Sequence, residues 1–260
     1  MHGRFEEPRV VENAEVEVLG AEVNRILEAA DGLSLRLTGS IAVQVRCPKL
    51  GHLARRDRRF HDIDFAAYRQ DATPIQGVLT DLGYVEDREV TVFSDGTRAI
   101  FEQPESRLHI DVFYDRLDFC HLIPLEGRLE TDGPTLPLVE LLLGKLQIVK
   151  INKKDLVDAA VLLLEHPLED VDAGAINLAH MVRLASEEWG LWRTVMMNLD
   201  KIEALASEPG WLSVEQQARV VAQASAIRDR MESAPKSLTW RMRARLGDRV
   251  KWYKDVEDVR

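Results

Sequence analysis

The sequence predicts an α+β fold, in which a small mixed β-sheet with flanking helices is followed by an all-helical C-terminal domain. Up to about residue 135, short segments with strand-like alternation of apolar residues occur between helical segments. After Pro137, apolar residues recur almost only with helical spacing. We therefore expect one domain over residues 1–135 and a helical domain over residues 136–260 that completes the active site. A chain of 260 residues is long enough for two such units.

The expected elements of the first half follow from apolar spacing and from turn residues. Residues 10–30 alternate apolar and acidic positions with helical spacing, and Gly32 then supplies a stop signal. Residues 33–37 alternate with period two, so they predict a strand, which leads into a short helix at 41–45. The remaining elements, in chain order, are a strand at 63–68, a helix at 73–82, a hairpin at 88–103 with its turn at 94–97, a strand at 108–114 and a strand at 120–125.

Helical periodicity marks the second half at 137–149, 154–165, 173–189, 191–206, 213–232 and 236–254. The last of these segments holds seven basic side chains and one acidic one, although the whole chain has a net charge of −10. The acidic total argues against general nucleic-acid binding, but a basic end can bind an anion. Arg241, Arg245 and Arg249 would share a helix face that could contact RNA. The alternative is a solvated terminal helix whose tryptophans pack inward.

Several protein classes lack support in the sequence. It has no apolar run long enough to span a membrane, and its N-terminus has no apolar core of the signal-peptide type. Cys47 and Cys120 are expected to be buried thiols rather than a disulfide. The motifs of a nucleophile elbow and of a P-loop are absent. We therefore expect a cytoplasmic protein that does not bind a membrane.

Carboxylates on two of the expected strands are candidate metal ligands. Asp62 and Asp64 are two residues apart, so on a strand both point to one face while Ile63 and Phe65 point to the other. If the strand that contains Asp111 lies beside them, it adds a third carboxylate. Such hard oxygen ligands suit Mg²⁺ or Mn²⁺, which would offset their mutual repulsion. The alternatives are a solvated strand face for the first two residues and a strand-end cap for Asp111.

Two further segments are candidate phosphate-binding elements. The backbone amides of Gly39 and Ser40, at the start of a short helix, can bind phosphate oxygens, and the serine hydroxyl adds a donor. Lys145 interrupts an apolar helix, so it either snorkels from the edge of the core or reaches an anionic ligand. Asp155 and Asp158 are three apart and share a helix face. They could equally be acidic residues favoured at a helix N-terminus.

Together these motifs resemble the nucleotidyltransferase superfamily with the DNA polymerase β-like core. That superfamily pairs a helix-opening Gly-Ser or Gly-Gly with an Asp-x-Asp strand and a third acidic strand. The chain is most similar to the AbiEii-type branch, the toxin half of some bacterial toxin–antitoxin pairs, and Arg59 before HDID matches a basic residue of that branch. KLQIVK followed by NKKDLVD fits its Lys-Leu-rich helix and Asp pair, which places on the pattern Lys145, Lys150, Asp155 and Asp158.

The resemblance implies a role for each matched residue. Asp62 and Asp64 would bind both metal ions, and Asp111 would hold the catalytic ion and help to deprotonate the acceptor. The residues implied to bind the NTP are Gly39, Ser40, Lys145 and Lys150. Asp155 or Asp158 would orient Lys145 or the acceptor.

The implied activity is transfer of a nucleoside monophosphate from an NTP to an acceptor hydroxyl or phosphate, with Mg²⁺ or Mn²⁺ as cofactor. The acceptor would be RNA such as tRNA, and an antitoxin protein would be a partner. One alternative is a small-molecule nucleotidyltransferase of the antibiotic-modifying type. Another is a non-catalytic nucleotide-binding or partner-binding protein that kept the core.

Overall fold

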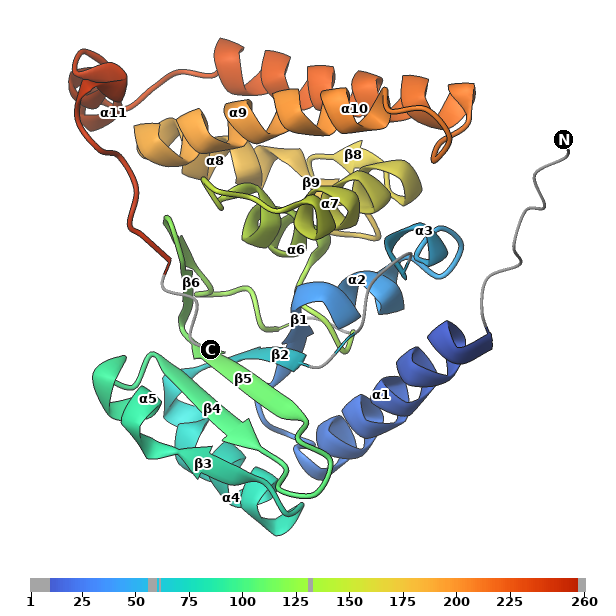
Figure 1. The fold of residues 1–260 in the computed structure, drawn as a ribbon. Helices are drawn as coiled ribbons and strands as arrows, with labels where there is room; N and C mark the ends of the chain where they lie inside the picture. Colours follow the sequence, from blue (N-terminus) through green and yellow to red (C-terminus); the bar gives the residue numbers. More distant parts are fainter. Residues whose placement is uncertain (1–9, 56–59, 61, 131–132, 257–260) are drawn as a thin grey trace, which may run out of the picture.

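A computed structural model describes residues 10–55, 60, 62–130 and 133–256 of the chain (Figure 1). It is a mixed α+β structure, as the sequence predicts, with a small mixed sheet at one end and stacked helices at the other. The change from sheet to helices falls near the expected junction, and the division into two domains stays a prediction. Among the described helices, none has the length and apolar character needed to cross a membrane.

The main sheet has five strands in the order β1-β2-β5-β4-β3. Their bounds are β1 (Arg36–Thr38), β2 (Asp62–Ala67), β3 (Val85–Asp87), β4 (Arg98–Glu102) and β5 (His109–Tyr114). β2 and β5 are parallel, whereas every other neighbouring pair is antiparallel. Ile63 and Phe65 of β2 are fully buried, so the alternating carboxylates of this strand lie on the opposite face of the sheet.

The register between β2 and β5 brings the expected carboxylates together. Asp64 lies directly opposite Asp111, so the two side chains share a face on adjacent strands. The condition under which Asp111 adds a third carboxylate, that its strand lies beside the Asp-x-Asp strand, is therefore met. Neighbouring strands are about 4.8 Å apart, which makes these two carboxylates close neighbours.

Helices of the first half surround this sheet: α1 (Val10–Ala29), α2 (Gly39–Arg46), α3 (His52–Arg55), α4 (Ala72–Asp81) and α5 (Arg88–Phe93). The short helix α2 packs against β2 and also contacts α6 (Leu138–Leu146) and α7 (Lys153–Glu165) of the second half, so it connects the sheet to the helical layer (Figure 1). One continuous cluster of buried apolar residues extends from Leu19 in α1 to Met231 near the end of α10.

The predicted hairpin at 88–103 is wrong in its first arm. REVTVF forms α5, and the antiparallel partner of β4 is the preceding segment, β3. The Asp87 carboxylate accepts hydrogen bonds from the backbone N–H groups of Glu89 and Val90, which caps a helix start. Val92 and Phe93 are exposed, so the branched residues that suggested a strand have no second layer to cover them.

Two smaller differences concern strand boundaries. The predicted strand at 33–37 is shorter than expected, because β1 begins only at Arg36. The predicted strand at 120–125 is present as β7 (Leu122–Pro124), and it pairs with β6 (Arg116–Asp118) in a separate two-stranded ribbon.

The second half is helical except for one short parallel pair, β8 (Leu168–Glu169) and β9 (Ile176–Asn177). Its helices are α6 (Leu138–Leu146), α7 (Lys153–Glu165), α8 (Leu178–Glu187), α9 (Trp189–Ala206), α10 (Val214–Ser233) and α11 (Leu238–Ala244). The helix expected over 173–189 is shorter than predicted. α8 starts only after Asn177, whose side chain accepts a hydrogen bond from the backbone N–H of His180.

The predicted helix over 236–254 is also wrong. α11 ends at Ala244, a short 3₁₀ turn follows at Gly247–Arg249, and the chain then returns toward the sheet in an extended conformation (Figure 1). The Arg243 guanidinium donates to the carbonyl oxygens of Gly247 and Val250, which closes a turn where a helix would have continued. Helical spacing in the sequence therefore did not reveal where the helix ends.

Candidate active site

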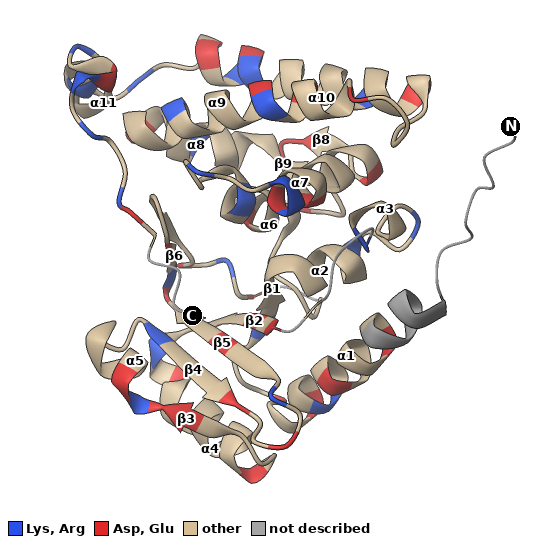
Figure 2. Cartoon of the chain, viewed as in Figure 1, with Lys and Arg blue, Asp and Glu red and all other residues tan. Residues whose placement is uncertain are grey.

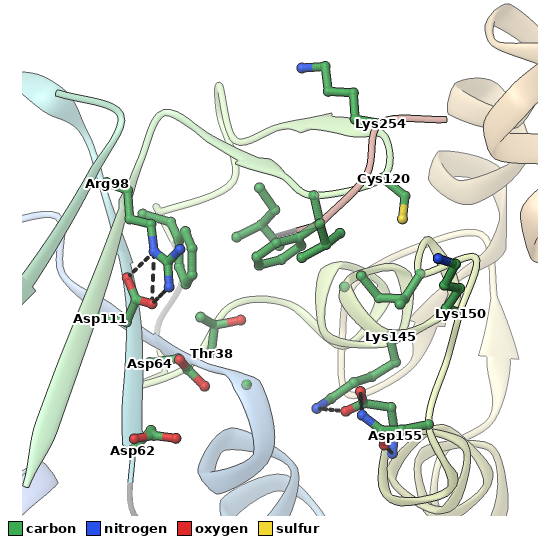
Figure 3. Close-up of a pocket in the computed structure, with 18 of the residues that line it drawn as sticks. Thr38, Asp62, Asp64, Arg98, Asp111, Cys120, Lys145, Lys150, Asp155 and Lys254 are labelled. Carbon is green, nitrogen blue, oxygen red and sulfur yellow. Dashed lines mark hydrogen bonds and ion pairs between the residues drawn. The ribbon is translucent and has the colours of Figure 1, made fainter. Parts of the chain in front are cut away.

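A cleft of about 730 Å³ lies between the sheet and the helical half (Figure 3). Most of the predicted site residues line it: Gly39, Asp62, Asp64, Asp111, Lys145, Lys150 and Asp155. Asp62, Asp64 and Asp111 come from β2 and β5, the two lysines come from α6 and the turn that follows it, and Asp155 comes from the start of α7. Figure 2 shows red at β2 and β5, blue at α6, and both colours at α7. Ser40 and Asp158 are not among the residues that line the cleft, and Arg59 is outside the described residues.

Asp62 and Asp64 lie on the side of the cleft that the β-sheet forms, and no cationic side chain among the described residues pairs with them. Asp62 is exposed and Asp64 is partly buried, and neither forms a hydrogen bond or ion pair with any residue that the structure describes. Burial, and next the negative charge of Asp111, raise the pKa of Asp64 to about 7. A bound cation would stabilise the ionised form of Asp64, because its positive charge offsets both the burial of the carboxylate and the negative charge of Asp111.

Gly39 lets the Asp64 carboxylate approach the start of α2. A β-carbon at Gly39 would lie 1.9 Å from Oδ2 of Asp64, and the φ angle of this glycine is +66°. The carboxylate therefore occupies the space next to the backbone that was predicted to receive phosphate. A negative group beside the first turn of a helix is favoured by the helix dipole. The glycine is thus required by a side chain of the neighbouring strand.

Asp111 has a cationic partner that the sequence did not suggest. Nε of Arg98 lies 2.9 Å from both carboxylate oxygens, and Nη2 of the same guanidinium also bonds Oδ2. The guanidinium carbon is 5.4 Å from the centre of the Phe113 ring. Burial raises the pKa of Asp111 although Arg98 opposes the shift. The only sequence signal for this pair is a single arginine at the start of the strand RAIFE.

Lys145 lies at the centre of a charged network between α6, α7 and α2. Its Nζ is 2.6 Å from Oδ1 of Asp155, 3.0 Å from Oδ2 of Asp158 and 3.1 Å from Oγ of Ser40. The Ser40 hydroxyl donates in turn to Asp158 at 3.0 Å. Lys145 is 9% exposed and Asp158 is fully buried. The lysine is therefore held by anions inside the protein and does not snorkel to solvent.

The start of α7 fixes the geometry of this network. The Asn152 side chain accepts a hydrogen bond from the backbone N–H of Asp155 at 2.9 Å and caps the helix. Its amide nitrogen also donates to Oδ2 of Asp155 at 2.9 Å, which leaves Oδ1 directed at Lys145. Asp155 and Asp158 share one helix face as their spacing predicts. Lys150 is exposed at the rim of the cleft, in the turn between α6 and α7.

The extended segment after α11 forms another part of the cleft wall, which sequence reasoning missed. Residues 253–256 line the cleft. The backbone N–H of Lys254 donates to the carbonyl of Cys120 at 3.1 Å, and its Nζ is 2.6 Å from Asp118. The indole N–H of Trp252 donates to Oγ1 of Thr194 at 3.0 Å. The chain was predicted to be helical up to residue 254, so its contact with β6 and with the turn that follows β6 could not be foreseen.

The donor set can be compared with the needs of a divalent cation. Carboxylate oxygens are the ligands that Mg²⁺ and Mn²⁺ prefer, and Asp62 and Asp64 supply them without a competing cation among the described residues. Asp111 is already bound by Arg98. Within the described part of the chain, no group of three His, Cys, Asp or Glu side chains is arranged to hold a metal ion. The residues therefore fit a cation bound through the two carboxylates of β2.

Comparisons of the chain with protein-family models, with curated proteins and with solved structures find no match. A functional interpretation therefore rests on the chemistry of the cleft and on the motif resemblance described above.

Proposed function

We propose that this protein is a metal-dependent nucleotidyltransferase, which moves a nucleoside monophosphate from an NTP to an acceptor hydroxyl or phosphate. One observation carries the proposal: a single cleft has on one wall the Asp62 and Asp64 carboxylates, which have no partner among the described residues, and on the opposite wall the Lys145 ammonium group (Figure 3). Phosphoryl-group transfer needs both, because catalysis depends mainly on positioning the phosphates and on offsetting their charge.

The sheet wall would hold the cofactor. Asp62 and Asp64 would bind Mg²⁺ or Mn²⁺, which supplies positive charge to the phosphates and lowers the pKa of an attacking hydroxyl. Gly39 keeps the Asp64 carboxylate in place by leaving room beside the start of α2. The motif resemblance also assigns a metal to Asp111, although this carboxylate already has Arg98 as its cationic partner.

The helical wall would bind the triphosphate. Asp155 and Asp158 hold the Lys145 ammonium group at the cleft, so no side-chain entropy is lost when a phosphate replaces one of its contacts. Ser40 adds a hydroxyl to the same network. Lys150 at the rim would meet the outer part of the NTP or the acceptor.

A labelling experiment tests the proposal and identifies the acceptor. The protein is incubated with each of the four labelled NTPs, Mg²⁺, and either total RNA or a metabolite extract. Label on RNA, for example on tRNA, is the result expected of a toxin, whose partner antitoxin should then suppress the reaction. Label on a small molecule would instead indicate an antibiotic-type enzyme. NTP binding without transfer to any acceptor would contradict the proposal and indicate a non-catalytic nucleotide-binding protein.

Lys145→Ala should weaken NTP binding far more than Lys153→Ala. A hydrogen bond to a charged group contributes roughly 1.5–3 kcal/mol, so we expect a loss of about 10- to 100-fold in affinity. Lys153 is a suitable control because it starts the neighbouring helix, is 69% exposed at its side chain and pairs with Glu208. Calorimetric titration with a non-hydrolysable NTP measures both constants.

Lys145→Ala leaves buried Asp158 without its lysine partner, so this variant could lose NTP affinity simply because it is less stable. Thermal unfolding of the same two variants shows whether each is folded under the conditions of the titration. Equal NTP affinities for two folded variants would remove Lys145 from the triphosphate site.

Replacing Arg241, Arg245 and Arg249 with glutamine should weaken RNA binding if RNA is the acceptor. All three side chains are exposed, although they extend over α11 and the following turn instead of one helix face. Each lost single-strand phosphate contact lowers the log–log salt slope of RNA affinity by roughly 0.7. Labelled RNA is titrated at several salt concentrations, and NTP binding should stay unchanged.

A control with the same change of charge is the triple variant of Arg88, Arg107 and Arg219, which lie on other surfaces. Identical slopes for the two triple variants would mean that the segment after α10 does not contact RNA, and would favour a small-molecule acceptor.

A further inference from the structure

The ion pair with Arg98 occupies Asp111, one of the three strand carboxylates that line the cleft. Both oxygens of Asp111 accept from the guanidinium, and Asp111 is 8% exposed. Two-point binding of this kind is the strongest geometry available between an arginine and a carboxylate. In Figure 3 dashed lines join Arg98 to Asp111, whereas Asp62 and Asp64 have none.

The strand order explains how Arg98 reaches Asp111 from the side opposite to Asp64. β5 lies between β2 and β4, and Asp111 is opposite Asp64 on one side and Ile100 on the other. Arg98 is two residues from Ile100 on β4, so it projects from the same face. The Asp111 carboxylate thus lies between a second carboxylate and a guanidinium, and it is bonded to the guanidinium.

Other contacts fix Arg98 in this position. Its side chain is 29% exposed, and the Phe113 ring lies beneath its guanidinium at 5.4 Å. A divalent cation bound to Asp111 would approach the guanidinium to within a few ångströms, where like charges repel strongly in a partly buried site. Arg98 therefore competes with a metal ion for Asp111.

We propose that Arg98 is a positioning residue that holds Asp111 as its counter-ion, so the nucleotide-free cleft binds one divalent cation, through Asp62 and Asp64, instead of two. This inference rests on the proposed function. It differs from the assignment that the motif resemblance gives to Asp111.

Binding of Mn²⁺ alone tests the inference without measuring activity. Mn²⁺ is titrated by calorimetry and by electron paramagnetic resonance into the full chain and into four variants: Arg98→Gln, Asp111→Asn, the double variant of both, and Asp64→Asn. We expect one ion on the wild type and none on Asp64→Asn. Arg98→Gln frees a carboxylate and removes a positive charge, so its affinity should rise about tenfold or more.

The double variant distinguishes a counter-ion from a metal ligand. Asp111→Asn leaves the Arg98 charge uncompensated beside the site, so Mn²⁺ affinity should fall, whether or not Asp111 is a ligand. Removing both charges should restore the wild-type affinity to within about twofold. A metal ligand could not be lost without cost, so a double variant as weak as Asp111→Asn would overturn the inference. This comparison remains decisive even if Arg98→Gln alone fails to fold.

The remaining outcomes separate this inference from the proposed function. One ion on the wild type, lost in Asp64→Asn but unaffected by Arg98→Gln, would leave the metal site intact and overturn the role of Arg98. Two ions on the nucleotide-free wild type would do the same. No Mn²⁺ on the wild type but binding to Arg98→Gln would overturn the inference as stated, because the nucleotide-free cleft would then hold no ion instead of one. No Mn²⁺ on any variant would overturn both proposals.

Discussion

Asp64→Asn should abolish nucleotidyl transfer while leaving the metal-free protein at least as stable as the wild type. Losing one ligand of the cation removes charge stabilisation of a kind that contributes about 10²–10³-fold or more to a rate. The pKa of Asp64 is raised to about 7 by burial and by Asp111, so its ionised form is disfavoured in the folded protein. A raised folded-state pKa means that the folded protein holds this proton more tightly than the unfolded chain does. The free energy of unfolding of the wild type therefore falls as pH rises from about 4 toward 7. Asparagine does not carry that charge.

The measurement combines transfer of labelled nucleotide with thermal unfolding at pH 8 in the presence of a chelator. Asp62→Asn is expected to show the same loss of transfer. Asp31→Asn is a suitable control, because Asp31 is an exposed aspartate in a turn after α1. Normal Mg²⁺-dependent turnover in Asp64→Asn would rule out the assignment of the carboxylate pair.

Gly39→Ala should remove activity and also destabilise the fold. A left-handed φ costs a non-glycine residue about 1–2 kcal/mol. In addition, the new methyl group would overlap Oδ2 of Asp64, at 1.9 Å, so the carboxylate would have to move away from the cleft wall. We therefore expect loss of Mn²⁺ binding together with a lower melting temperature.

A second glycine separates these two effects. Gly127 has a φ of +67°, nearly the same as Gly39, but a β-carbon there would meet nothing within 4 Å. Gly127→Ala should therefore lower stability by the backbone cost alone and keep both Mn²⁺ binding and transfer. If Gly39→Ala retained wild-type Mn²⁺ affinity, the close packing of Asp64 against α2 would not matter for the site.

Local spacing in the sequence was sufficient to predict several parts of the site. Asp62 and Asp64 share a face because side chains alternate along any strand. Asp155 and Asp158 share a helix face as their spacing predicts, and the structure places both carboxylates against Lys145. Both inferences depend on geometry that one strand or one helix fixes over a few residues, which is why the sequence could support them.

The predictions from local sequence pattern were wrong in two segments, where a helix cap or a turn determines the structure. REVTVF has the β-branched residues of a strand, but the Asp87 cap and the exposure of Phe93 make it a helix. The segment 236–254 keeps helical spacing, but the Arg243 side chain closes a turn onto the backbone. Propensity is a weak preference that one capping hydrogen bond or the lack of a covering layer can reverse.

The sequence by itself thus determined which carboxylates and lysines could serve a phosphate-transfer site and on which faces of their elements they lie. Only the tertiary structure decided which of those charges have partners. Arg98 bonds Asp111 because β4 and β5 pair in a particular register, whereas Asp64, opposite Asp111 on the next strand, has no such partner within the described part of the chain. The physical reason is that the interaction of two charges depends on their separation in space and on the solvent excluded around them, and both are fixed by the pairing of strands and helices.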